Sequence, residues 1–253
     1  MKSETAQDLE CIVMHNGETT IQYCLDSIHE QTLKAASIET VSFISPINES
    51  INKRHELMSL PYSIKVDADM VLYPHCFDFL YRKIKQSNKN IYAVTGMLED
   101  PFIGLMGAVH MEKTELVKDI NIPDVIGCDR YLRNFMLKKG NAIQEFQETV
   151  AQHWSDWSEE AIFKRHVRVG QKLAYYKTQH YDDWILEIGH RWMEWNRDSP
   201  FLALLGLCYG LLTPDQKEKG KGFADKEWEL VQRLMKYKVI PKADYLYSQR
   251  GKP

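Results

Sequence analysis

The stretch CIVMHNGETTIQYCLDSIHEQT, residues 11–32, decides the expected fold. Its first four residues are apolar and run into His15-Asn16-Gly17, which is typical of a buried strand that stops at a polar loop. From residue 18 to about residue 34 the apolar positions recur at helical spacing, so a helix is predicted there. The chain therefore begins with a strand followed by a helix.

The same alternation continues along the first half of the chain. We expect strands at residues 38–44, 62–66 and 91–95, a further apolar stretch at 104–111, and helices at 48–60, 75–86 and 129–139, the last ended by Gly140. Strands that alternate with helices of about 10–15 residues predict βαβ units and a mainly parallel sheet. Such a sheet binds ligands beyond the carboxyl ends of its strands.

Composition excludes several other classes of protein. The chain has 253 residues, of which 44% are hydrophobic and 26% charged, and its net charge is −3. These values exclude collagen-like and disordered chains, and the near-neutral charge argues against a dedicated nucleic-acid binder. The five cysteines are scattered without a C-x-x-C pair, and the first residues contain no apolar run, so we expect a cytoplasmic protein. The longest apolar run, residues 201–212, is too short to span a membrane.

The second half of the chain has a different texture. After His153 strand signals become rare, and segments rich in Trp, Tyr, Arg and Lys predict helices at residues 158–176, 182–195, 200–212 and 226–237. We therefore divide the chain into an α/β domain, residues 1–154, and a helical C-terminal region, residues 155–253.

Two carboxylates follow the predicted strand that ends at Val66, in the sequence Lys65-Val66-Asp67-Ala68-Asp69. In a loop that leaves a strand end, Asp67 and Asp69 can approach one point. Carboxylate oxygens suit a hard cation such as Mg²⁺ or Mn²⁺, which shares them with phosphate oxygens. The alternative is a turn in which aspartates bond backbone amides.

Four further pieces accompany this motif in a particular order. They are the strand-end loop with Asn16, the stretch CLDSIHEQT at residues 24–32, the segment GCDRYLR at residues 127–133, and His153. Together with Asp67-Ala68-Asp69 as a DxD motif, residues 10–155 resemble the GT-A-fold, nucleotide-sugar-dependent glycosyltransferases, in particular the large inverting group called family 2. The resemblance implies an α/β GT-A fold with a Rossmann-like mixed sheet, here followed by a helical C-terminal appendage.

The resemblance also implies an activity and its residues. The enzyme would move a sugar from a nucleotide-diphosphate donor to a hydroxyl of a glycan or glycolipid acceptor, with inversion and with Mn²⁺ or Mg²⁺, in polysaccharide biosynthesis. Asp129 would be the general base. The implied metal ligands are Asp67, Asp69 and His153, and the implied nucleotide contacts are His15, Asn16, Glu18, Ser45, Lys53, Asp67 and Ala68.

The chain departs from the family at two points. Ser45-Pro46-Ile47-Asn48 stands where the family has an acidic pair that reads the nucleobase, so the base contact would come from elsewhere. Cys128 stands where a Glu is common, which leaves Asp129 alone before the acceptor-side helix. The basic residue near the nucleotide is Lys53 or Arg54, and we favour Lys53.

Structural alternatives exist for each of these residues. Asp129 could be the N-cap of the helix that follows it, His153 a surface or helix-capping residue, and His15-Asn16-Gly17 a simple turn. For the whole chain, the alternatives are a sugar-nucleotide nucleotidyltransferase, for which a Gly-rich triphosphate loop is missing, and a catalytically degenerate scaffold protein.

The predicted helix at residues 161–180 carries five basic residues and no acidic ones, with aromatic residues among them. A basic amphipathic helix can lie on anionic lipid, which would place the protein at the inner face of the membrane. The alternatives are a solvated face packed on the catalytic domain and a contact in a homo-oligomer.

Overall fold

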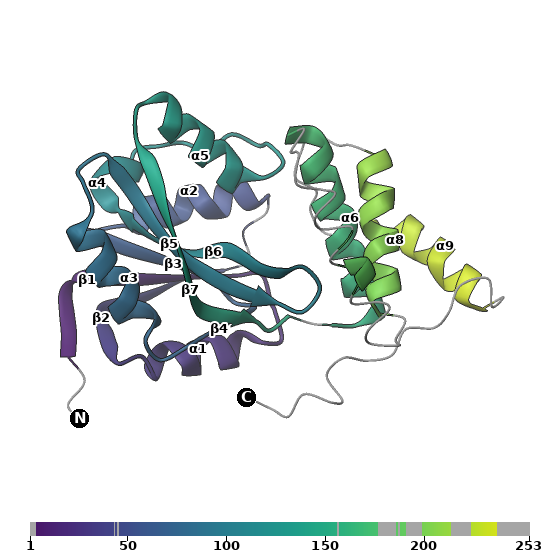
Figure 1. The fold of residues 1–253 in the computed structure, drawn as a ribbon, viewed down its shortest axis with the longest axis horizontal. Helices are drawn as coiled ribbons and strands as arrows, with labels where there is room; N and C mark the ends of the chain where they lie inside the picture. The colour runs from purple at the N-terminus through teal and green to yellow at the C-terminus, as the bar shows by residue number, and fades with distance from the viewer. Residues whose placement is uncertain are drawn as a thin grey trace. The chain divides into compact units, whose positions relative to one another are not determined.

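The structure is a computed structural model that describes residues 4–42, 44, 46–155, 157–176, 186, 188–190, 199–213 and 224–236. The chain divides into two units (Figure 1). The sheet unit comprises residues 1–101 and 105–155, and the helical unit comprises residues 102–104 and 156–253. The division into domains made from the sequence stays a proposal, because compact units need not fold independently.

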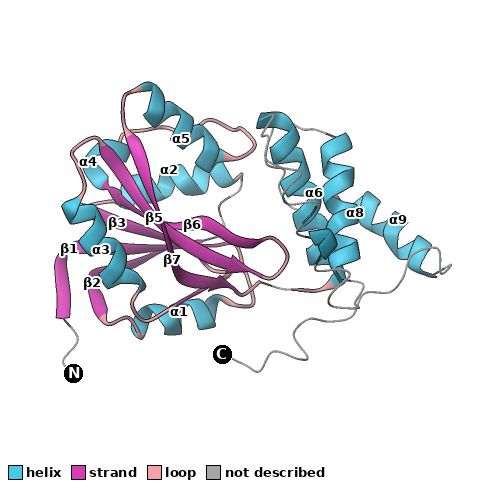
Figure 2. Cartoon of the chain, viewed as in Figure 1, coloured by secondary structure: helices cyan, strands magenta, loops and turns pink. Residues whose placement is uncertain are grey.

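Strands and helices alternate through the sheet unit (Figure 2). In chain order the elements are β1 (Glu4–His15), α1 (Ile21–His29), β2 (Leu33–Ser42), α2 (Ile47–Leu57), β3 (Tyr62–Asp67), β4 (Met70–Leu72), α3 (Cys76–Gln86), β5 (Ile91–Asp100), β6 (Gly104–Lys113), α4 (Thr114–Val117), α5 (Cys128–Lys138) and β7 (Ala142–His153).

The seven strands form one sheet in the order β2-β1-β3-β6-β5-β7-β4. Strand β1 runs parallel to β2 and β3, and β5 runs parallel to β7. Strands β3 and β6 are antiparallel, as are β4 and β7. The sheet is therefore mixed, as expected, and the carboxyl ends of β1 and β3 meet at one edge.

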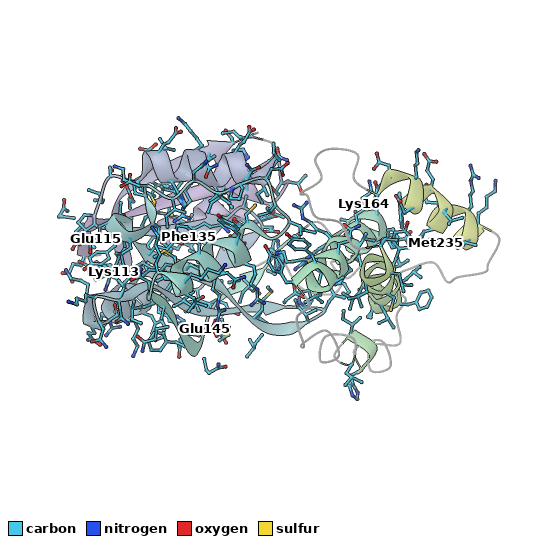
Figure 3. The ribbon with its side chains drawn as sticks, turned by 90° about the horizontal axis from the view of Figure 1, so that it is seen from above. Lys113, Glu115, Phe135, Glu145, Lys164 and Met235 are labelled. Carbon is cyan, nitrogen blue, oxygen red and sulfur yellow. The ribbon has the colours of Figure 1, made fainter. Side chains whose placement is uncertain are left out.

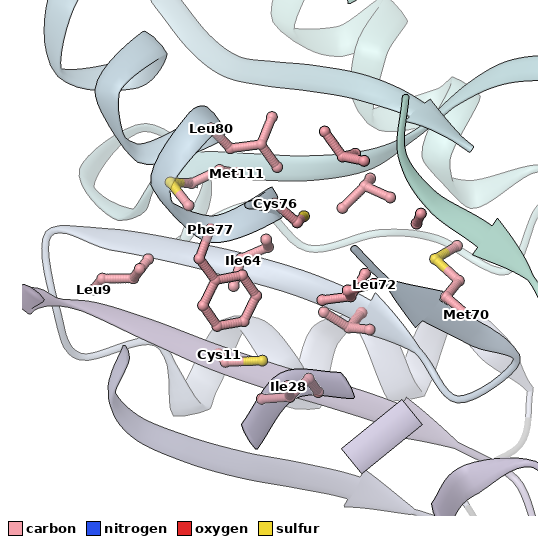
Figure 4. Close-up of a cluster of buried hydrophobic side chains, with 14 of the residues drawn as sticks. Leu9, Cys11, Ile28, Ile64, Met70, Leu72, Cys76, Phe77, Leu80 and Met111 are labelled. Carbon is pink, nitrogen blue, oxygen red and sulfur yellow. The ribbon is translucent and has the colours of Figure 1, made fainter. Parts of the chain in front are cut away.

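Helices cover both faces of the sheet. Helices α1 and α3 pack on one face, where Cys24, Ile28 and Phe77 join strand residues such as Ile64 in a buried cluster (Figure 4). Helices α2, α4 and α5 pack on the other face around Ile12. Both sides of the central strands are thus removed from water, which is why their sequences read as continuous apolar runs.

Several boundaries differ from the sequence prediction. The first helix ends at His29 rather than near Lys34, and the second strand begins at Leu33 rather than at residue 38. The buried amide of Gln31 accounts for this early ending, because it donates to Ser27 O and Tyr73 O and accepts from Phe77 N. Strand β1 also begins at Glu4, seven residues before its apolar run.

The prediction missed β7 altogether. Its sequence, AIQEFQETVAQH, is rich in Gln and Glu, which are uncommon in strands. The strand forms because it pairs with β5 on one side and β4 on the other. Its last residue is His153.

The helical unit contains α6 (Glu159–Tyr176), α8 (Ser199–Leu212) and α9 (Asp225–Lys236). These confirm three predicted helices, whereas the fourth, residues 182–195, lies almost entirely outside the described residues. Helices α6 and α8 approach closely, because a Cβ atom at Gly170 would overlap Leu207 O and one at Gly210 would overlap Val167 O. Over the described part of the chain, none of the helices combines the length and apolar character needed to cross a membrane.

Candidate active site

The Asp67-Ala68-Asp69 loop connects β3 to β4 and is fixed by its backbone. Ala68 N donates to Met14 O of β1 over 3.0 Å, and Thr20 Oγ1, just before α1, donates to Ala68 O over 3.1 Å. Trp154 N donates to Asp69 O over 2.6 Å. Three separate segments thus hold this loop at the carboxyl ends of β1 and β3, where an α/β sheet binds ligands.

Asp69 faces His153. The Asp69 Oδ2 atom lies 2.7 Å from His153 Nε2, and the other ring nitrogen, Nδ1, lies 2.8 Å from Asp100 Oδ2. Asp69 directly precedes the first residue of β4, His153 ends β7 and Asp100 ends β5, so three strand ends converge. The side chain of Asp69 is 28% exposed, that of His153 is 8% exposed and that of Asp100 is fully buried. The solvent-accessible side of this group is therefore the side of Asp69.

Asp67 instead faces Lys65. The Lys65 Nζ atom lies 3.3 Å from Asp67 Oδ2 and 3.4 Å from Asp129 Oδ1. Burial raises the pKa of the Asp67 carboxyl, and Lys65 opposes that rise. Burial alone would lower the pKa of the Lys65 amine, but the charges of Asp129 and Asp67 outweigh it and raise that pKa. Lys65 is therefore a permanent cation between two carboxylates.

Asp129 lies in the first turn of α5 with its side chain half exposed. The N-cap residue of this helix is Gly127, which has a positive φ of 68°, and no side chain caps the helix. The alternative interpretation of Asp129 as the N-cap is therefore wrong. A carboxylate in the first turn is still favoured by the positive end of the helix dipole.

The loop after β1 is closed by its own residues. Asn16 N donates to Glu18 Oε2 over 2.6 Å, and Gly17 N donates to His15 Nδ1 over 3.4 Å. Met14 pairs in register with Asp67, so this loop leaves the sheet beside the Asp67-Ala68-Asp69 loop. The contact of His15, Asn16 and Glu18 with a nucleotide stays a prediction.

Of the other two predicted nucleotide contacts, the structure describes only Lys53. Lys53 pairs with Glu56 over 2.8 Å, and both side chains are largely exposed. Arg54, the alternative, is buried and pairs with Glu112. Ser45 lies outside the described residues. Their roles stay predictions, and the cation observed beside the motif is Lys65.

Asp69 and His153 form the best candidate for a metal site. In the described part of the chain no three His, Cys, Asp or Glu side chains gather as a closed cage. Mg²⁺ usually binds through one or two protein ligands and completes its shell with water and substrate phosphates. Two ligand atoms at right angles around an octahedral Mg²⁺ stand roughly 3 Å apart, close to the 2.7 Å between Asp69 Oδ2 and His153 Nε2. The donor pair fits such a cation.

Sequence reasoning missed Asp100 and Lys65. Asp100 follows an apolar strand that was predicted to end at residue 95, so its position at a strand end was hidden. Lys65 lies between Ile64 and Val66 in a predicted buried strand, and a lysine at such a position was a usable sequence signal, because Lys is almost never fully buried without a partner.

Comparison with known proteins gives the fold its class. No family model matches the chain, and no curated protein matches it by sequence. Among solved structures, the chain is similar to a mannosyltransferase from Pyrobaculum calidifontis, PcManGT, in complex with GDP-Man and Mn²⁺. The TM-score is 0.53 and the identity 16%, and the match covers 92% of this chain and 81% of the other. The chain has the GT-A fold, which confirms the predicted fold class.

Two weaker likenesses have TM-scores below 0.5 and add nothing to the assignment. Glucosyl-3-phosphoglycerate synthase from Mycobacterium tuberculosis with phosphoglyceric acid gives a TM-score of 0.49 at 13% identity, over 67% of this chain and 78% of the other. Residues 1–349 of TarS from S. aureus give 0.47 at 12% identity, over 98% of both chains.

Proposed function

We propose that this protein is a metal-dependent glycosyltransferase that transfers a sugar from a nucleotide-diphosphate donor to a hydroxyl of a glycan or glycolipid acceptor. The observation that carries the proposal is the pairing of Asp69 with His153 over 2.7 Å, at the carboxyl edge of a GT-A sheet. The structural likeness to a mannosyltransferase that holds GDP-Man and Mn²⁺ supports it.

Asp69 and His153 would hold Mn²⁺ or Mg²⁺. When bound, the cation supplies Lewis-acid stabilisation of the departing diphosphate. Asp67, the third metal ligand expected from the sequence, faces Lys65, and we assign it to the ribose or to a metal-bound water. The backbone of Ala68 and the loop with His15, Asn16 and Glu18 would contact the nucleotide, together with Ser45 and Lys53.

Asp129 would be the general base. Its half-exposed carboxylate can accept a proton from an acceptor hydroxyl as that hydroxyl attacks the anomeric carbon. Lys65 pairs with both Asp129 and Asp67, and so links the proposed base to the donor-binding loop. Attack from the face opposite the diphosphate would invert the anomeric configuration.

A thermal-shift screen tests the proposal. UDP, GDP, CDP and their sugars are added with and without Mn²⁺. One diphosphate should stabilise the protein only when the metal is present, because ligands that bind the folded state raise its stability by mass action. No response, or one without metal dependence, would favour the degenerate scaffold. A preference for a triphosphate with a sugar phosphate would favour the nucleotidyltransferase.

The membrane and oligomer predictions stay untested. In α6, Lys164, which Figure 3 labels, pairs with Glu160 and with Asp225. The Arg165 guanidinium lies 5.0 Å from the Trp157 ring centroid. These contacts engage part of the basic face within the helical unit. We retain peripheral contact at the inner membrane face, homo-oligomer formation and a cytoplasmic location as predictions.

A further inference from the structure

Asp100 is a carboxylate at a strand end whose side chain is fully buried. Burying a carboxylate is strongly unfavourable unless it is paired and hydrogen-bonded. Here the Oδ2 atom lies 2.8 Å from His153 Nδ1. The burial and the contact together point to the His153 ring as a partner that stabilises the buried Asp100 carboxylate.

The strand register explains how this contact arises. Leu98 and Glu99 of β5 pair with Ala151 and Gln152 of β7, which places Asp100 beside His153 at the end of the same ladder. On its other side His153 pairs with Met70 of β4. The histidine is thus held between two strands, and its ring bridges from Asp100 to Asp69.

We infer that Asp100 is a positioning residue, which holds the His153 ring so that Nε2 faces the cation bound by Asp69; this inference rests on the proposed function. An ionised carboxylate only accepts hydrogen bonds, so the 2.8 Å contact with Asp100 places a proton on His153 Nδ1, and a cation bound by Asp69 would take the place of any proton on Nε2. Metal-binding histidines commonly donate their second nitrogen to a carboxylate, which fixes the tautomer and the orientation of the ring. Asp100 touches neither substrate nor metal and acts through His153.

The first test needs no substitution in Asp100. In the metal-free protein, ¹⁵N-resolved NMR of the imidazole groups, with His153 assigned through a His153→Gln variant, should show a slowly exchanging proton on Nδ1. A bare Nδ1, with the proton on Nε2 alone, would overturn the inference whatever the metal affinity is.

The second test measures the affinity for Mn²⁺ alone, from the EPR signal of the free ion. Removal of an outer carboxylate of this kind weakens metal binding by about 10–100-fold, so Asp100→Asn should raise the Kd by that factor and abolish the protected Nδ1 proton. Glu99→Gln is the matched control, because Glu99 is the exposed neighbour on the opposite face of the strand. It should leave the Kd unchanged.

The outcomes separate the inference from the proposed function. Normal Mn²⁺ binding by the wild type and by Asp100→Asn would overturn the role of Asp100 alone. An equal loss in Glu99→Gln would also overturn it, because the effect would not be specific to the histidine contact. No Mn²⁺ binding by the wild type would overturn the inference and the proposed function together. If Asp100→Asn fails to fold, NMR of the wild type still tests whether His153 Nδ1 carries a proton held by Asp100.

Discussion

The two carboxylates of Asp67-Ala68-Asp69 are two residues apart in sequence but belong to different environments. Asp69 faces an imidazole that is backed by a second carboxylate, Asp100. Asp67 faces the ammonium group of Lys65, which also pairs with Asp129. The first region combines carboxylate oxygens with an imidazole, whereas the second already contains a cation. Under the proposed function, the short acidic motif therefore divides into a metal side and a substrate side.

The largest expected effect is on turnover and concerns the substrate side. Asp129→Asn should lower kcat by about 10²–10⁴-fold, because the amide cannot take the acceptor proton, and should leave the Mn²⁺-dependent thermal shift intact. Turnover is measured as release of nucleoside diphosphate from the sugar nucleotide found in the screen. Asp124→Asn, an exposed acid in the loop before α5, is the control. Full activity of Asp129→Asn would remove the base assignment.

The next effect distinguishes the two motif carboxylates. At a free concentration of 100 times its Kd, a ligand stabilises the folded protein by about 2.7 kcal/mol. Asp69→Asn should lose this stabilisation by Mn²⁺, and Asp67→Asn should keep it, because Lys65 rather than the metal faces Asp67. Differential scanning fluorimetry with Mn²⁺ alone measures both. If both variants lose the shift equally, Asp67 is a metal ligand as well and the contrast between the two sides fails.

Two histidines of the sheet unit, His55 and His110, predict how the stability of the protein depends on pH. Burial lowers the pKa of His55 and of His110, with Arg54 adding to the effect at His55 and Lys65 adding to it at His110. Asp129 and Glu112 oppose the shift at His110 without cancelling it. In the unfolded chain both histidines bind a proton at about pH 6.5, and in the folded protein they do so only at lower pH.

The sign of the pH effect follows from these protons. Below pH 6.5 the unfolded state binds more protons than the folded state, so the free energy of unfolding falls as the pH falls. Each histidine contributes a slope of up to about 1.4 kcal/mol per pH unit. Urea unfolding between pH 7 and 5 measures the slope, which His110→Gln should reduce. An unchanged slope in that variant would show that His110 titrates normally.

The smallest effect concerns Lys65 itself. Lys65→Met leaves Asp67 and Asp129 without their shared cation and should lower the free energy of unfolding by about 1 kcal/mol, because water screens much of the repulsion between partly exposed carboxylates. Lys53→Met is the matched control, since its amine pairs with Glu56 where both side chains are exposed. Urea denaturation should show no measurable change in the control. If Lys65→Met leaves the free energy of unfolding unchanged, the ion pairs of Lys65 with Asp67 and Asp129 contribute nothing to stability.

The site was predictable where it lay next to a recognisable strand. Asp67 and Asp69 directly follow an apolar run, so their place at the carboxyl edge could be inferred without a structure. His153 was named only through a resemblance, because β7 is too polar to be recognised as a strand. Asp100 could not be found at all, since its role depends on pairing with β7 in a specific register.

The amino-acid sequence by itself determined the alternation of strands and helices, the GT-A class of the fold and the location of the acidic loop. The alternation and the place of the loop follow from local hydrophobic periodicity and turn residues, which act over a few neighbouring positions, whereas the GT-A class was expected from the resemblance of residues 10–155 to that family. Only the tertiary structure decided where α1 ends, that β7 exists, and which partner each motif carboxylate has. Those features depend on groups far apart in the chain, such as Asp69 with His153 and Gln31 with Phe77, whose proximity no local pattern encodes.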